Sequence, residues 1–148
     1  MLNVRDVTPI LNVSSLQESF AWFERLGWQK LWEHGDPPTF GAVMAGESEI
    51  FLCQGCQGTR GGAKHREPWD NQAGSTWMSW WLPSPAEVDQ LYALALRLGV
   101  DAPWPPTDMP WNVHECHIRH PDGHTFRVGA GIECDEEPSS PQVLIEEL

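Results

Sequence analysis

A cluster of histidine and acidic residues near the end of the chain has the residue types of a metal site. His117, His120 and His124 surround a Pro-Asp-Gly sequence, and Glu115 lies two residues before the first of them. Imidazole nitrogens and carboxylate oxygens are ordinary ligands of zinc and other transition metals. The first hypothesis for this stretch is therefore a metal centre.

The strand pattern of the same stretch argues against that hypothesis. Apolar and polar residues alternate over residues 113–119 and, after the turn, over residues 125–128, which is typical of a β-hairpin. Alternate side chains of a strand share a face, so Glu115 and His117 should face a cleft together. The other two histidines should flank the turn in solvent, and we predict no metal ligands here. The opposite face should pack under a helix: Cys116, Ile118, Phe126 and Val128.

The four cysteines form no clear chemical motif. Cys53 and Cys56 make one Cys-x-x-Cys pair, whereas a zinc ribbon needs two such pairs and only Cys116 and Cys134 remain. A disulfide framework is typical of shorter secreted chains. We interpret the pair as a chance placement at the end of a strand.

Composition and charge narrow the classes of partner. The chain has 148 residues and a net charge of −12, so nucleic acid, which needs a basic footprint, is excluded as a partner. No apolar run approaches membrane-spanning length, and the N-terminus lacks a signal-peptide pattern, which together favour a cytoplasmic protein without a membrane partner. The acidic field would favour a cationic small molecule.

The chain contains nine tryptophans against one tyrosine. Each indole has a large flat face and one N–H group that needs a hydrogen-bond acceptor. A tryptophan can fill the core or, at alternate positions of a strand, line an aromatic groove, and for each single tryptophan both interpretations stay open.

The first half of the chain predicts the order β-α-β-β-β. A strand over residues 7–13 precedes a helix that should begin at Ser15, in a capping box with Glu18, and end at Gly27. Three further strands are expected, over residues 28–34, 39–45 and 49–53. A glycine-rich stretch over residues 54–74 follows, either as a linker or as a basic lip that binds anions.

The second half repeats that order. A strand over residues 75–82 precedes a helix from Ser84 to Gly99, a proline-rich segment that is at best a short strand over residues 100–106, and the hairpin. The expected fold class is α+β, with two tandem βαβββ modules curled around a cleft and helices outside. The domain should span residues 1–132, with module one at 4–53 and module two at 75–132, before an acidic tail over residues 133–148.

On these motifs the chain resembles the vicinal oxygen chelate superfamily of glyoxalases, extradiol dioxygenases and bleomycin resistance proteins, over about residues 4–131. The most specific stretch is Pro110-Trp111 followed by a short strand and Pro121-Asp122-Gly123, which is typical of the bleomycin resistance type. Two further stretches carry the resemblance: residues 9–27 and residues 97–100.

The resemblance implies where a metal would bind. The metalloenzymes take ligands from the first and fourth strands of each module, which places Thr8, Phe51, Trp77 and Arg127 at the ligand positions. None of the four is His, Glu, Asp or Cys, so the usual metal site should be absent. Two aromatic residues at these positions suit a stacking groove better than a coordination sphere.

We therefore predict a metal-free, cofactor-free binding protein that sequesters a planar or cationic drug or metabolite, such as a cationic antibiotic, in a tryptophan-lined cleft. The rings would stack on the ligand, and Glu49 or Glu115 would pair with its charge. The predicted ligand-binding residues are Trp32, Glu49, Phe51, Trp77, Trp81, Trp111, Glu115, His117 and Arg127.

Two alternatives remain open at the level of sequence. The first is a metal-dependent lyase or dioxygenase of the same superfamily, with its ligands relocated to residues such as Glu115 and His117. The second is a small-metabolite sensor with no resistance role. An enzyme is thus less expected than a binding protein. The resemblance also implies a homodimer with clefts at or near the interface.

Overall fold

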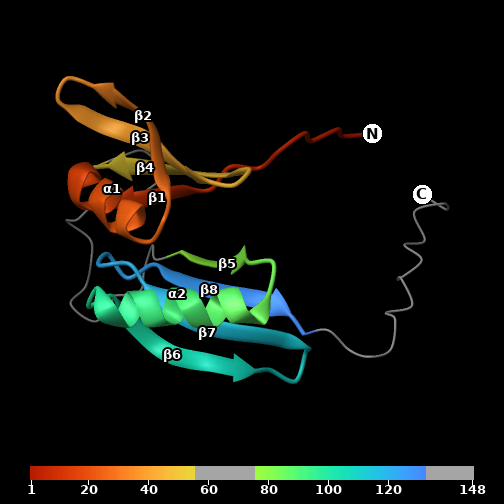
Figure 1. Ribbon diagram of the computed structural model, residues 1–148. Coiled ribbons are helices and arrows are strands. Elements are labelled where there is room, and N and C mark those ends of the chain that lie inside the picture. The colour runs from red at the N-terminus through yellow and green to blue at the C-terminus, as the bar shows by residue number, and fades with distance from the viewer. Residues whose placement is uncertain (56–75, 133–148) are drawn as a thin grey trace, which may run out of the picture.

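The computed structural model describes residues 1–55 and 76–132, which form two repeated units of secondary structure (Figure 1). We call the unit that ends with β4 module one and the unit that begins with β5 module two. The order β-α-β-β-β occurs in both, which confirms the predicted α+β repeat. The elements are β1 (Ile10–Val13), α1 (Leu16–Arg25), β2 (Gln29–Gly35), β3 (Pro38–Ala45), β4 (Ser48–Gln54), β5 (Trp77–Trp81), α2 (Pro85–Arg97), β6 (Asp101–Asp108), β7 (Val113–Arg119) and β8 (Thr125–Gly131).

Both helices begin and end where the sequence predicts. Ser15 and Ser84 each accept, through the side-chain oxygen, a hydrogen bond from the backbone N–H three residues further on, at 3.2 and 3.4 Å. These oxygens satisfy donors that the first helical turn leaves unpaired. Gly27 and Gly99 follow the helices with φ of 98° and 70°, a conformation that residues with a Cβ rarely adopt.

Each module folds into its own four-stranded mixed sheet. The strand orders are β1-β4-β3-β2 and β5-β8-β7-β6. In both sheets the first strand pairs in parallel with the fourth, and the other neighbours are antiparallel. The identical order in the two sheets shows that the tandem repeat seen in the sequence is also a repeat of topology.

The core joins the two modules through helix α1. Trp22 and Phe23 of α1 contact Phe126 of β8, with ring centres 5.7 and 5.9 Å apart. Helix α2 covers β6, β7 and β8 from the same side as this contact. The alternate residues predicted to lie under a helix, Cys116, Ile118, Phe126 and Val128, are all fully buried. The other face of the second sheet therefore faces away from the core.

His120 and His124 contradict the prediction that they lie in solvent, because both side chains are only 2% exposed. Nδ1 of His120 accepts a backbone N–H from the turn, so Nε2 carries the proton and donates to Ser19 of α1 at 3.0 Å. His124 accepts the N–H of Thr76 and donates to the carbonyl of Asn12 at 2.7 Å. The hairpin turn thus docks against module one, a tertiary contact that local pattern does not reveal.

Two strands differ in extent from the prediction. Strand β1 begins at Ile10 rather than at residue 7. Strand β6 runs for eight residues through the proline-rich segment, where only a short strand was expected. It is an edge strand with two register shifts against β7, a position at which proline is tolerated.

Several predictions fall outside the described residues. They concern the basic lip within residues 54–74, the acidic tail over residues 133–148, and two of the cysteines, Cys56 and Cys134. Within residues 1–55 and 76–132, no helix combines the length and the apolar character that crossing a bilayer requires.

Candidate ligand-binding site

The open face of module two carries the charged side chains that strand alternation predicts for a cleft. In the ladder between β7 and β8, His117 lies opposite Arg127, and Glu115 lies opposite Gly129. Because Gly129 has no side chain, Arg127 can extend diagonally across it towards Glu115. The register of the hairpin and one glycine therefore bring together the three polar residues.

Glu115 is the centre of the hydrogen-bond network on this face. Its carboxylate accepts two bonds from Arg127, Nε to Oε2 at 2.9 Å and Nη2 to Oε1 at 2.8 Å. Oε1 also accepts the indole N–H of Trp111 at 2.9 Å, and Oε2 lies 3.1 Å from Nε2 of His117. The side chain is 1% exposed, so each oxygen is occupied by two protein donors and faces almost no solvent.

The ion pair fixes the charges of both partners. The hydrogen bonds from Arg127 are the largest reason that the pKa of Glu115 falls to about 2 in spite of burial, and the contacts with His117 and Trp111 act in the same direction. The pKa of Arg127 is raised in turn by its bond to Glu115. Glu115 is thus ionised at neutral pH, and Nε2 of His117 must be the protonated nitrogen that donates to it.

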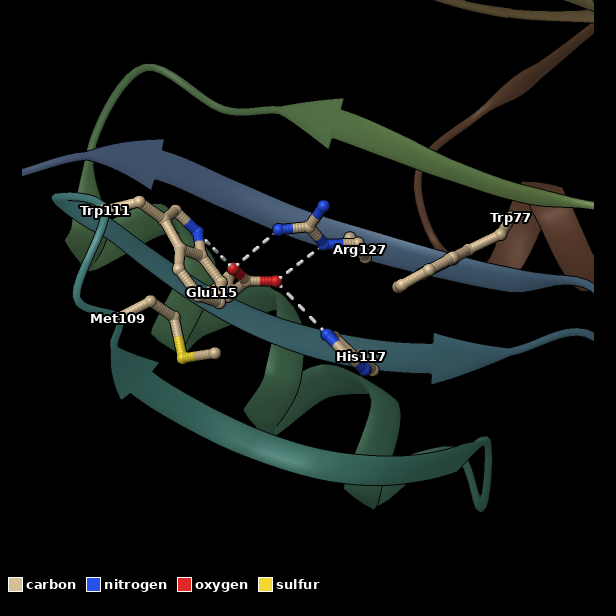
Figure 2. Close-up of a pocket in the computed structure, with 6 residues that line it drawn as sticks. All are labelled: Trp77, Met109, Trp111, Glu115, His117 and Arg127. Atoms are coloured by element: carbon tan, nitrogen blue, oxygen red, sulfur yellow. Dashed lines mark hydrogen bonds and ion pairs between the residues drawn. The ribbon is translucent and has the colours of Figure 1, made fainter.

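Two tryptophans flank the guanidinium of Arg127. Its central carbon lies 5.6 Å from the ring centre of Trp77 and 5.8 Å from that of Trp111, within the range of cation–π contacts. Figure 2 shows the guanidinium between the two indoles, with its outer nitrogen outside the dashed bonds to Glu115. Trp77 and Trp111 are 67% and 53% exposed, so their faces remain open to a ligand.

The turn between β6 and β7 positions Trp111. Met109 donates its N–H to the carbonyl of Val113 at 2.9 Å, and Asn112 donates to the carbonyl of Met109 at 3.1 Å. Asn112 has φ of 61°, a left-handed conformation that asparagine tolerates better than most residues. This turn also places Met109 beside the pocket, a residue that sequence reasoning missed because no motif marks it.

The side chains of this face line an open pocket of about 500 Å³, a volume within the range of small-molecule sites. Five of the nine predicted ligand-binding residues come together here. The lining consists of Trp77, Met109, Trp111, Glu115, His117 and Arg127 (Figure 2).

The structure places the other four predicted residues elsewhere. Trp32 and Phe51 lie on module one with ring centres 5.3 Å apart, and both also contact the ring of Phe40. Glu49 occupies the alternate position on β4, two residues before Phe51. Trp81 is 66% exposed on β5, beyond the lining of the pocket. The aromatic residues therefore form two groups, one on each module.

Comparison of the sequence with known families agrees with the fold described above. The family model of the Glyoxalase/Bleomycin resistance protein/Dioxygenase superfamily matches residues 7–128. The chain belongs to this superfamily. No curated protein matches the sequence.

Solved structures of the superfamily share the fold. A glyoxalase/bleomycin resistance protein/dioxygenase from Nocardioides is 24% identical, covers 93% of this chain and 89% of its own, and has a TM-score of 0.69. A lactoylglutathione lyase from Agrobacterium tumefaciens is 19% identical over 87% of this chain and 95% of its own, with a TM-score of 0.65. A bleomycin-binding protein complexed with bleomycin is 16% identical over 86% and 99%, with a TM-score of 0.61.

The metal positions implied by the superfamily do not fit a metal ion in this member. Thr8, Phe51, Trp77 and Arg127 supply a hydroxyl, two rings and a guanidinium, whereas a divalent metal needs several converging His, Cys, Asp or Glu donors. A metal site relocated to Glu115 does not fit either, since that carboxylate already binds the guanidinium of Arg127 at 2.8 Å. Within residues 1–55 and 76–132, no three such donors lie close enough together to hold an ion.

Proposed function

We propose that this superfamily member binds and sequesters a planar, drug-sized molecule in the pocket of module two without transforming it. The observation that carries the proposal is the guanidinium of Arg127 held between the exposed indoles of Trp77 and Trp111. Flat faces on both sides of a fixed charge suit an aromatic ring system, and each stacking contact contributes about 0.5–2 kcal/mol.

The state of Glu115 favours binding over catalysis. A general base works best with a pKa near the operating pH and needs a free lone pair within reach of the substrate. Glu115 has a pKa of about 2, and both of its oxygens are occupied by protein donors. Its carboxylate therefore holds Arg127, Trp111 and His117 in place rather than taking a proton from a ligand.

We further propose that a second copy of the chain covers the open face of module two. The tryptophans of this face at positions 77, 81, 104 and 111 are 67%, 66%, 43% and 53% exposed, an unusual exposure for side chains of this size. The aromatic group on module one around Trp32 and Phe51 is partly exposed and lies outside the pocket. A homodimer that sets one group over the other would enclose the ligand.

Light scattering at several protein concentrations tests the dimer. A mass near twice the chain mass of 16.7 kDa is expected, and replacement of Trp104 by lysine should shift the protein towards the monomer. A wild-type protein that stays monomeric at all concentrations would contradict the dimer, while the pocket itself would remain open to a separate test.

Titration of the intrinsic tryptophan fluorescence tests the binding function. A panel of planar aromatic compounds, with bleomycin included, should contain members that quench the fluorescence in a saturable way. Elemental analysis of the same protein separates binding from the metal-dependent alternative. Stoichiometric nickel, zinc, iron or manganese, together with no saturable quenching, would favour a lyase or dioxygenase instead.

A further inference from the structure

We infer that the ligand of this pocket carries an anionic group at the edge of its planar ring system, and that Arg127 receives that group. The inference rests on the proposed binding function and names the chemical class of ligand. It also reverses the expectation, drawn from the net charge and from Glu115, that the pocket would favour a cation.

Glu115 has no capacity left for a ligand cation. A carboxylate has about four favourable acceptor directions, two at each oxygen. In this protein Arg127 takes two of them, Trp111 the third and His117 the fourth. The side chain is also only 1% exposed, so a cationic group in the pocket would have to displace a protein donor to reach it.

Arg127 keeps unused donors on the side that faces the pocket. A guanidinium has five N–H donors, and Glu115 accepts one from Nε and one from Nη2. Within the described parts of the chain, no further acceptor is found for the remaining three. The side chain is 30% exposed, and its outer nitrogen lies away from Glu115 (Figure 2). The planar fork can therefore bind a second anion.

The two indoles and the guanidinium together match a flat ring that carries an anionic edge. The indoles of Trp77 and Trp111 flank Arg127 at similar distances, 5.6 and 5.8 Å. A flat ring inserted along these faces would point its edge at the guanidinium. A carboxylate, sulfonate, phosphate or phenolate on that edge would then make charge-assisted hydrogen bonds, whereas an ammonium there would meet a like charge.

Three probes of one shape test the inference: 2-naphthoate, the neutral 2-naphthamide and the cationic 2-naphthylmethylammonium. Isothermal titration calorimetry in about 0.15 M salt limits the influence of distant charges, because the screening length is then about 8 Å. We expect naphthoate to bind at least about ten-fold more tightly than naphthamide, on the scale of hydrogen bonds to charged groups, and the ammonium to bind most weakly.

Two variants assign the preference to Arg127. The double variant Glu115→Gln/Arg127→Gln removes both charges, so no buried charge is left alone, and it should bind naphthoate and naphthamide about equally. The variant Arg127→Lys keeps the positive charge and a partner for Glu115 but loses the planar fork. It should keep a reduced preference for naphthoate, and a melting curve close to that of the wild type would show that it folds.

The outcomes separate this inference from the function on which it rests. Binding of the three probes with equal affinity, or with a preference for the ammonium, would overturn the anionic ligand and leave the planar binding site standing. Failure of all three probes to bind would overturn the proposed binding function and this inference with it. A preference for naphthoate that survives in the double variant would overturn the role of Arg127.

Discussion

Arg127 and Glu115 form a two-pronged ion pair across the neighbouring strands β8 and β7, with N···O distances of 2.9 and 2.8 Å. The pair decides which charge the pocket presents. Glu115 becomes an internal acceptor for protein donors, and the guanidinium becomes the charged group that faces the pocket. The pocket of this negatively charged superfamily member thus exposes a guanidinium rather than a carboxylate.

Loss of the guanidinium should destabilise the fold as well as the site. Arg127→Met leaves Glu115, 1% exposed, without its counter-charge, and we expect a decrease of about 2–4 kcal/mol in the free energy of unfolding. Urea unfolding at pH 7 measures the effect. The double variant Arg127→Met/Glu115→Gln should recover part of the loss, because no unpaired charge remains. An Arg127→Met protein as stable as the wild type would show that Glu115 does not depend on the pair.

Acidification should weaken the contact between the modules through His120. Burial lowers the pKa of His120 from 6.5 to about 4. The unfolded chain therefore takes up this proton first, and stability is lost as the pH falls from about 6.5 to 4, by up to about 3 kcal/mol. Urea unfolding at several pH values should show the slope in the wild type and a flatter slope in His120→Asn. The exposed His34, replaced in the same way, is the control.

A second histidine, His114, should make the protein less stable as the pH rises, which is opposite to the effect of His120. The ring nitrogens of His114 lie 2.7 Å from Asp89 of α2 and 2.7 Å from Asp108 of β6. The bond to Asp89 is the largest reason that the pKa of His114 is raised. Its contribution to stability is full below pH 6.5 and is lost as the pH rises through the raised pKa.

Titration of His114 by NMR tests this assignment. The midpoint should lie above 6.5 in the wild type and move towards 6.5 in Asp89→Asn. A wild-type midpoint at or below 6.5 would show that the two carboxylates do not hold the charged imidazole.

Gly41 should tolerate a side chain poorly where α1 approaches the first sheet. A Cβ at this position would clash with Cζ of Phe20 and lie 2.8 Å from the carbonyl oxygen of Trp32. We expect Gly41→Ala to cost about 1–3 kcal/mol of stability through overpacking. Gly131→Ala is the matched control, since nothing lies within 4 Å of its Cβ. Equal melting temperatures for the two variants would contradict the close approach.

The sequence predicts most of the fold because the fold depends on local signals. Serine caps, glycine ends and alternation of apolar residues mark both helices and most strands, and the second module repeats the first. The Pro-Asp-Gly turn sets the register of the hairpin, which puts Glu115, His117 and Arg127 on one face. Contacts between distant segments have no such signal. His120 and His124 look like exposed turn residues until module one is packed against them.

The sequence predicts which side chains share the face of the site, but it does not predict which of them bond to one another. Alternation indicates that Glu115 and Arg127 share a side, but only the register shows that Gly129 leaves room for their pairing. That pairing changes the expected ligand, because it removes the carboxylate to which a cation would bind. Trp32 and Phe51 were predicted to line the same pocket as Trp77 and lie elsewhere. The placement of one module relative to the other decides whether two aromatic groups share a pocket, and strand alternation does not reveal that placement.

We expect a planar ligand to bind against Trp77 and Trp111 above Arg127. Trp77 and Trp81 offer a matched comparison, because both lie on β5, on one face, with exposures of 67% and 66%, and only Trp77 lines the pocket. Calorimetric titration of 2-naphthoate into Trp77→Leu and Trp81→Leu measures the difference. We predict binding about five- to thirty-fold weaker in Trp77→Leu, the equivalent of about 1–2 kcal/mol, and unchanged in Trp81→Leu. Equal affinities in the two variants would contradict the claim.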